Sequence, residues 1–279
     1  MKADRIKRAH LRDTFLERSR KQVLLMGILN VTPDSFSDGG AFFDSAMAMS
    51  QAQLMEAQGA DILDVGGEST RPGAIPVSAQ DEAGRVLSVL PALCDDGSRI
   101  VSVDTYKAWV ARAAAEAGAV IINDVWGMTR DPNMAQAVFD TGSAVVVTYN
   151  RGVASPDVNL IDDMRAFFDK AFLTAQEAGV PREHVVLDPG VGFGKTWEQN
   201  FNVLARLDVL LDYDVLILVC VSRKSFIGTL LDREVDNRLS GSLAAGLASV
   251  QRGASILRVH DVGAHADALK VWQAIDEAG

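Results

Sequence analysis

Eight short apolar runs, separated by longer Ala-rich stretches, constrain the fold of this chain more than any other feature of its sequence. The runs are rich in β-branched and aliphatic residues, and the stretches between them have the spacing of amphipathic helices. This alternation is typical of repeated βα units around a parallel sheet. The runs cover residues 23–29, 61–65, 100–103, 120–122, 143–147, 185–187, 216–221 and 256–259.

Eight strands and eight helices predict an α/β fold, a single (β/α)8 TIM barrel. The chain has 279 residues, and barrels of this kind commonly need about 250. The helix-like stretches include residues 79–93 and 238–252. Because the runs are evenly spaced and no linker interrupts them, we predict one barrel domain, residues 23–279. An open, doubly wound sheet has the same periodicity and is the alternative fold.

The segment before this domain has a different composition. Residues 1–22 hold eight Lys and Arg residues against three acidic residues. We predict a basic N-terminal extension that is helical around Leu11 to Leu16.

Charge and cysteine content restrict the partners and the compartment. The net charge of −10 argues against nucleic acid or an anionic membrane as a partner. No segment offers the roughly 18 uninterrupted apolar residues that a membrane span needs. Cys94 and Cys220 lie far apart in apolar segments, so we expect no disulfide framework and a cytoplasmic location.

Polar residues follow the predicted strands, and the active sites of barrel enzymes are built where strands meet the following loops. Helix capping accounts for Asp124 and Asp261, but it does not explain cations such as Arg71 and Lys224. The sequence therefore predicts one mouth of the barrel that gathers carboxylates, amides and cations. In chain order this set is Asn30, Glu68 to Arg71, Asp104, Asn123 with Asp124, Thr148 to Asn150, Asp188, Ser222 to Lys224, and Arg258 with His260 and Asp261.

Asp104, Asn123 and Asp188 suit a ring that carries several fixed donors and acceptors. A carboxylate accepts two N–H donors, and an amide supplies both a donor and an acceptor. An amino-substituted heterocycle such as a pterin or a purine fits this set. The alternative is a buried triad whose members satisfy only one another.

Cations and hydroxyls near the last two strands indicate an anion site. Ser222, Arg258 and His260 are candidate phosphate ligands, because loops after strands seven and eight hold phosphate in many barrels. Arg223 is better explained by a salt bridge. The glycine-rich run at residues 190–196 lacks the spacing of a P-loop. Transition-metal ligand patterns are missing from the sequence, whereas Asn30 could supply one oxygen to Mg²⁺.

Seven segments, in order along the chain, resemble the motifs of the dihydropteroate synthase family. They are MGILNVTPDSFSDGG at residues 26–40, DVGGESTRPG at 64–73, SVDT at 102–105, IIND at 121–124, LDPGVGFG at 187–194, SRKS at 222–225 and RVHD at 258–261. The resemblance implies a barrel transferase of folate biosynthesis, usually a homodimer. It would join 6-hydroxymethyl-7,8-dihydropterin diphosphate to p-aminobenzoate and release diphosphate.

The same resemblance implies a role for each matching residue. Lys224, Asp104 and Arg71 would be catalytic. The pterin would be held by Asp104, Asn123, Asp188 and Lys224. The p-aminobenzoate would lie near Thr70, Arg71, Phe193 and Ser225, with Thr70 and Arg71 on a mobile loop. The diphosphate would be held by Asn30, Ser222, Arg258 and His260, and Asn30 would also meet Mg²⁺ as the cofactor.

One segment departs from the family pattern. The family commonly has a Met-His-Met type motif after strand five, whereas this chain has Thr148, Tyr149 and Asn150. A methionine that packs on the pterin face would be replaced by Thr148, and Tyr149 or Asn150 would refill the space or change the ligand. The alternatives are therefore a paralogous pterin-binding synthase with a different arylamine acceptor, or a noncatalytic pterin-binding protein.

Overall fold

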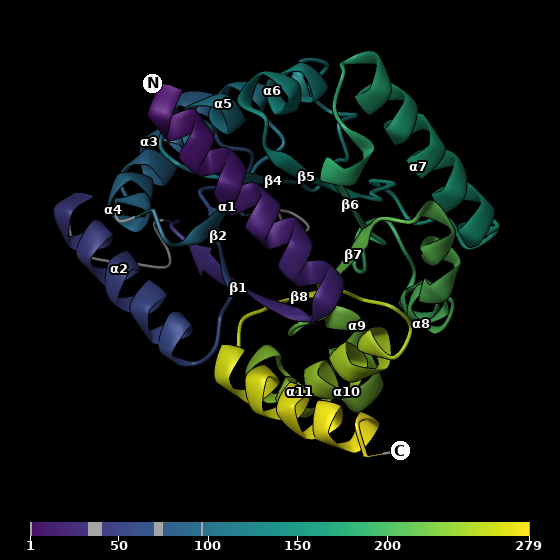
Figure 1. Ribbon diagram of the computed structural model, residues 1–279. Coiled ribbons are helices and arrows are strands. Elements are labelled where there is room, and N and C mark those ends of the chain that lie inside the picture. Colours follow the sequence, from purple (N-terminus) through teal and green to yellow (C-terminus); the bar gives the residue numbers. More distant parts are fainter. Residues whose placement is uncertain (1, 33–40, 70–74, 96, 279) are drawn as a thin grey trace.

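The computed structural model describes residues 2–32, 41–69, 75–95 and 97–278, and it shows a closed barrel of eight parallel strands (Figure 1). Each strand pairs with the next, and β1 also pairs with β8, which closes the sheet. The predicted (β/α)8 barrel is confirmed, and the open sheet is excluded. The strands are β1 (Leu24–Asn30), β2 (Ile62–Gly66), β3 (Ile100–Asp104), β4 (Ile121–Asp124), β5 (Ala144–Thr148), β6 (Val185–Asp188), β7 (Leu216–Val219) and β8 (Ile256–Val259).

Helices surround the barrel, and two of them differ from the sequence expectation. The helix expected over residues 79–93 is interrupted at Ser88, and a second helix begins at Leu90. Pro91 is tolerated only in the first turn of that second helix, because it has no backbone N–H to donate. The segment before β8 contains α9 as well as the expected helix. The helices after the first are α2 (Ala41–Ala57), α3 (Ala79–Leu87), α4 (Leu90–Cys94), α5 (Ala108–Glu116), α6 (Met134–Thr141), α7 (Leu160–Glu177), α8 (Trp197–Ala205), α9 (Ser225–Leu231), α10 (Leu239–Val250) and α11 (Val262–Asp276), with short 3₁₀ helices at Arg182–His184, Leu207–Tyr213 and Val235–Asn237. No helix in the described ranges is long and apolar enough to cross a membrane.

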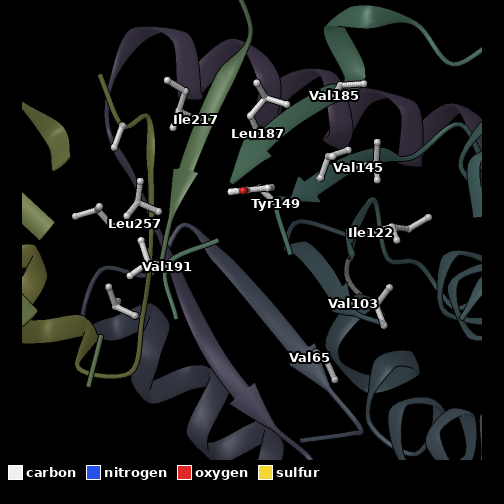
Figure 2. Packing of buried hydrophobic residues seen from close by; sticks show 14 of the residues in the cluster. Val65, Val103, Ile122, Val145, Tyr149, Val185, Leu187, Val191, Ile217 and Leu257 are labelled. Carbon is white, nitrogen blue, oxygen red and sulfur yellow. The ribbon is translucent and has the colours of Figure 1, made fainter. Parts of the chain in front are cut away.

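Side chains of successive strand residues point alternately into the barrel and towards the helices. The outward set forms the core between sheet and helices, and Figure 2 shows part of it, including Val145, Leu187 and Ile217. The interior of the barrel is here called the lumen, and the inward set fills its lower part. It comprises Leu24, Met26, Ile62, Ile100, Ile121, Ala144, Val146, Val186, Leu216, Leu218 and Ile256.

The alternation with a period of two residues continues towards the carboxyl end of the strands, where most inward residues are polar. Residues two or four positions beyond the apolar set share its face of the sheet. The inward positions near the carboxyl ends are Asn30, Asp64, Gly66, Ser102, Asp104, Asn123, Thr148, Asp188, Cys220 and Arg258. The change from apolar to polar along each strand places the polar site above a closed apolar floor.

The basic segment at the start of the chain is the helix α1 (Lys2–Lys21), which lies across the opposite end of the barrel (Figure 1). Phe15 and Leu16 are buried against the inward apolar set. Arg8 donates to the carbonyl of Thr141 at 2.9 Å, and Arg12 donates to the carbonyl of Gly142 at 2.6 Å. Arg8 and Arg12 of α1 therefore bind backbone carbonyls at this end of the barrel.

Replacing Phe15 with Ala should destabilise the protein by about 3–5 kcal/mol, because it leaves a cavity beneath the barrel. Phe15 is 0% exposed, whereas Ile6 of the same helix is 67% exposed and provides the matched control. Urea unfolding should show a large loss for Phe15→Ala and almost none for Ile6→Ala. Equal losses in the two variants would contradict the packing of α1 described here.

Candidate active site

Three charged side chains form the centre of the polar layer. Arg258 of β8 donates through Nε to Asp64 Oδ2 at 2.6 Å and through Nη2 to Asp104 Oδ2 at 2.6 Å. The two carboxylates come from β2 and β3, and they are 0% and 5% exposed. The third guanidinium nitrogen, Nη1, lies 3.8 Å from the sulfur of Cys220. We call Asp64, Asp104 and Arg258 the acid–arginine cluster.

The acid–arginine cluster has two carboxylates for one guanidinium, so full ionisation would leave a buried net negative charge. Burial raises the pKa of Asp104 to about 7, with Arg258 opposing the shift and the charge of Asp64 adding to it. Burial disfavours the charge of Arg258 as well, but Asp64 and Asp104 outweigh this and raise its pKa. Asp104 can therefore exchange a proton near neutral pH. Its Oδ1 has no hydrogen-bond partner among the described residues, so it is available to a ligand.

The ends of β1 and β4 add amides beside this cluster. Asn123 lies opposite Asp104 in the register and donates through Nδ2 to Asp64 at 3.1 Å. Asn30 lies opposite Gly66, where a Cβ atom would be 3.6 Å from both Asn30 Oδ1 and the Cβ of Asp104. Strands β1 to β4 thus bring Asn30, Asp104 and Asn123 together around the small residue Gly66.

The ends of β6 and β7 bring together a second group. Asp188 is buried, and its Oδ1 accepts the N–H of Gly190 at 2.7 Å. Burial raises the pKa of Asp188, which the Gly190 N–H and the charge of Lys224 oppose. The ammonium of Lys224 lies 4.5 Å from the centre of the Phe193 ring. Asp188, Phe193 and Lys224 therefore occupy one side of the mouth.

Lys195 is a residue that sequence reasoning missed. Its ammonium donates to the carbonyls of Gly190, Tyr149 and Phe193 at 2.8, 3.2 and 3.2 Å. Burial lowers its pKa to about 7, an effect that Asp188 opposes. Lys195 thus ties the loop that carries Phe193 to the end of β5. The sequence offered one signal for Lys195, its place in the glycine-rich run at residues 190–196. The structure shows that its ammonium binds backbone carbonyl groups.

Ser222 and His260 lie together at the ends of β7 and β8. The hydroxyl of Ser222 accepts the backbone N–H of His260 at 3.1 Å and lies 3.0 Å from its Nδ1. Arg223 forms the expected salt bridge, with Asp261 at 2.5 Å, so the side chain of Asp261 does not cap the following helix. Ser225 is exposed at the start of α9.

Hydrogen bonds join the Arg258 guanidinium to Asp64, Asp104 and Cys220, although the sequence grouped Arg258 with Ser222 and His260. Thr70 and Arg71 lie outside the described residues.

Comparisons with known proteins show to which family this chain belongs. A sequence model of the pterin binding enzyme family matches residues 26–260. The dihydropteroate synthase of Bacillus subtilis is 41% identical over 263 residues, which cover 93% of this chain and 91% of that protein. This chain belongs to the dihydropteroate synthase family. The members of this family are transferases of folate biosynthesis.

Solved structures of family members have the same fold. The Clostridium difficile dihydropteroate synthase, crystallised in the presence of pteroic acid, matches with a TM-score of 0.88 and 44% identity, over 91% of this chain and 97% of that chain. The Xanthomonas albilineans dihydropteroate synthase with 4-aminobenzoic acid matches with a TM-score of 0.87 and 42% identity, over 91% and 93% of the two chains. The polar mouth described above therefore lies in the fold of pterin-binding enzymes.

The segment that departs from the family pattern is divided between two faces of the sheet. Thr148 faces the lumen, whereas Tyr149 faces α7, where its ring lies 5.4 Å from that of Phe167. Figure 2 shows Tyr149 among the outward hydrophobic residues. Asn150 donates to the carbonyl of Val125 at 2.9 Å and accepts the N–H of Gly152 at 2.8 Å. Tyr149 is turned away from the lumen, so the expectation that it refills the space is wrong. The expectation that Asn150 refills the space or changes the ligand stays a prediction.

Mg²⁺ prefers hard oxygen ligands in a protein site. Among the described residues, no group of three or more His, Cys, Asp or Glu side chains could hold a metal ion. Asn30 nevertheless offers a hard amide oxygen beside Gly66, at the rim of the lumen. Mg²⁺ commonly takes one or two protein oxygens and completes its shell with water and substrate phosphates. The residues present therefore fit Mg²⁺ that is held mainly by diphosphate.

Asp64→Asn should lower the pKa of Asp104, because the negative charge of Asp64 contributes to raising it. The measurement is the carboxyl ¹³C chemical shift of Asp104 as a function of pH, with the resonance assigned from an Asp104→Asn sample. Asp212→Asn, on the exposed surface, is the control and should leave this titration unchanged. An unchanged midpoint in Asp64→Asn would show that the two carboxylates are not coupled.

Proposed function

We propose that the mouth of this barrel joins 6-hydroxymethyl-7,8-dihydropterin diphosphate to p-aminobenzoate and releases diphosphate. The observation that carries this proposal is the set of buried polar side chains on the lumen faces of β3, β4 and β6, namely Asp104, Asn123 and Asp188. Membership of the dihydropteroate synthase family supports it. So do the pteroic acid and 4-aminobenzoic acid named for the two solved relatives.

The pterin ring would bind within this buried set. Carboxylate and amide groups complement the N–H donors and acceptors at the edge of an aminopyrimidinone ring. The unpaired Oδ1 of Asp104 would accept from the ring, or donate to it when the carboxyl is protonated. Lys224 would place its ammonium beside Asp188 and the ring. The apolar floor keeps these bonds away from water, which strengthens them.

The diphosphate would lie higher in the mouth, between the ends of β1 and β8. Asn30, Ser222 and His260 would bind its oxygens, and Mg²⁺ held through Asn30 would neutralise the charge that develops as diphosphate leaves. In the present structure Arg258 is bonded to carboxylates, so we propose that it orients Asp64 and Asp104. Its direct contact with diphosphate stays a prediction from the resemblance.

The reaction breaks the bond between the pterin methylene carbon and the diphosphate oxygen. The neutral amino group of p-aminobenzoate supplies the electron pair for the new C–N bond, and the proton it then loses passes to solvent. Positive charge on the methylene spreads into a ring held by Asp104 and Asp188, which stabilises it. Positioning of the two substrates supplies much of the remaining rate. Phe193 and Ser225 would border the arylamine. That Thr70 and Arg71 cover it stays a prediction.

We also propose a cytoplasmic homodimer that needs neither nucleic acid nor a membrane. Cys94 and Cys220 are not joined in a disulfide, which suits a reducing compartment. Four large apolar side chains in and beside α9 are exposed, and exposed apolar clusters are typical of protein interfaces. They are Leu230, Leu231, Val235 and Leu239. Light scattering of the purified protein should give twice the chain mass of 29.9 kDa, and a mass of one chain would refute the dimer.

The experiment that tests the reaction measures diphosphate release from the pterin diphosphate in the presence of Mg²⁺, with and without p-aminobenzoate. We expect strong stimulation by p-aminobenzoate, formation of 7,8-dihydropteroate, and loss of the reaction when EDTA removes Mg²⁺. Stimulation only by another arylamine would identify the paralogous synthase. Pterin binding without any stimulation would identify a noncatalytic pterin-binding protein.

Single substitutions test which side chains belong to the active site. Lys224→Ala and Asp104→Ala should each lower kcat/KM by about 100-fold or more, since each removes a polar contact to the reacting ring. Lys170→Ala, on the exposed side of α7, is the matched control for lysine and should keep full activity. His260→Ala should mainly weaken inhibition by the product diphosphate. Full activity of Lys224→Ala or Asp104→Ala would refute these assignments.

A further inference from the structure

The hydroxyl of Thr148 is a buried polar group for which the structure gives no hydrogen-bond partner among the described residues. Thr148 is the last residue of β5 and is 1% exposed. Val146, two residues earlier, belongs to the inward apolar set, so Thr148 points into the lumen as well. The hydroxyl therefore lies on the wall of the lumen at the end where a ligand enters.

Leaving a buried hydroxyl without a partner costs free energy that an aliphatic side chain would not cost. Valine has nearly the same shape as threonine, and β5 already carries Val145, Val146 and Val147. The packing of β5 thus gives no reason for a hydroxyl at residue 148. A hydrogen bond to a bound molecule would supply the missing partner.

The position of Thr148 indicates which molecule this is. In the β5–β6 register Thr148 is paired with Asp188, whose buried carboxylate faces the same lumen. Ser102 also has an unpaired hydroxyl, but it lies one inward position below Asp104 and thus deeper in the barrel. Tyr149 and Asn150 are turned elsewhere or already bonded. Of these residues, only Thr148 is placed beside Asp188 at the mouth.

We propose that the Thr148 hydroxyl hydrogen-bonds to the polar edge of the pterin ring that Asp188 holds, and so helps to determine which ring this chain binds. The proposal rests on the proposed function, because it takes the ring to be a pterin. It assigns a polar contact to the position where the family commonly has an apolar methionine. The bond satisfies the hydroxyl only in the complex, so its contribution appears in ligand affinity.

The test compares three variants by calorimetric titration with 6-hydroxymethylpterin, a probe that requires no turnover. Thr148→Val keeps the shape and removes the hydroxyl, and we expect its dissociation constant to rise about five-fold, the worth of one neutral hydrogen bond. Thr148→Ser keeps the hydroxyl and should bind within about two-fold of the unaltered chain. Thr141→Val is the matched control, since the Thr141 hydroxyl already donates to the carbonyl of Ala137 at 2.8 Å, away from the lumen. Thermal unfolding confirms that each variant is folded.

The outcomes separate this inference from the proposed function. If the unaltered chain does not bind the pterin, the proposed function fails. If it binds, and Thr148→Val binds equally well, the inference alone is overturned. A Thr148→Ser variant as weak as Thr148→Val would also overturn it, because the lost contact would then be the methyl group. Selective weakening of Thr148→Val, with Thr141→Val unchanged, supports the hydrogen bond.

Discussion

The pairing of one buried guanidinium with two carboxylates is the interaction on which the rest of the site depends. Arg258 crosses the lumen from β8 to reach Asp64 on β2 and Asp104 on β3. Removing the guanidinium would leave two buried carboxylates without a counter-charge, which costs several kcal/mol. Burial raises the pKa of Asp104 and the charge of Asp64 adds to the shift, so the protonation of Asp104 responds to nearby charges such as those of a ligand. The charge balance within the lumen therefore affects both the stability of the barrel and the binding of its substrate.

The fold was predictable from the sequence because it follows from periodicity. Eight apolar runs gave the strands, and the rule that barrel sites lie at strand ends brought Asp104, Asn123 and Asp188 to one mouth. The short helix α9 was not predicted, since its seven residues combine an apolar run with a glycine and show no helical period. The place of α1 was not predictable either, because nothing in a basic amphipathic segment says which surface it will cover.

The finer contacts of the site depend on register, which one sequence does not reveal. The pairing of Arg258 with Asp64 joins residues 194 positions apart, and no local pattern indicates it. The sequence does not show which of Thr148 and Tyr149 faces the lumen, because a shift of one residue at the end of β5 would exchange their faces. Lys195 was overlooked for another reason: its partners are backbone carbonyls, which leave no trace in side-chain chemistry. Strand ends identify which residues can meet, but closure of the barrel decides which ones do.

The lower end of the barrel also affects the chemistry of the mouth. Phe15 of α1 seals the lumen from below, and the inward apolar set fills the space up to the acid–arginine cluster. Water can then reach the cluster only from the mouth. A bound ring that fills the mouth would remove this last access and strengthen every charge interaction beneath it, because the local dielectric falls. The helix α1, which lies across one end of the barrel, therefore contributes to the electrostatics at the other end.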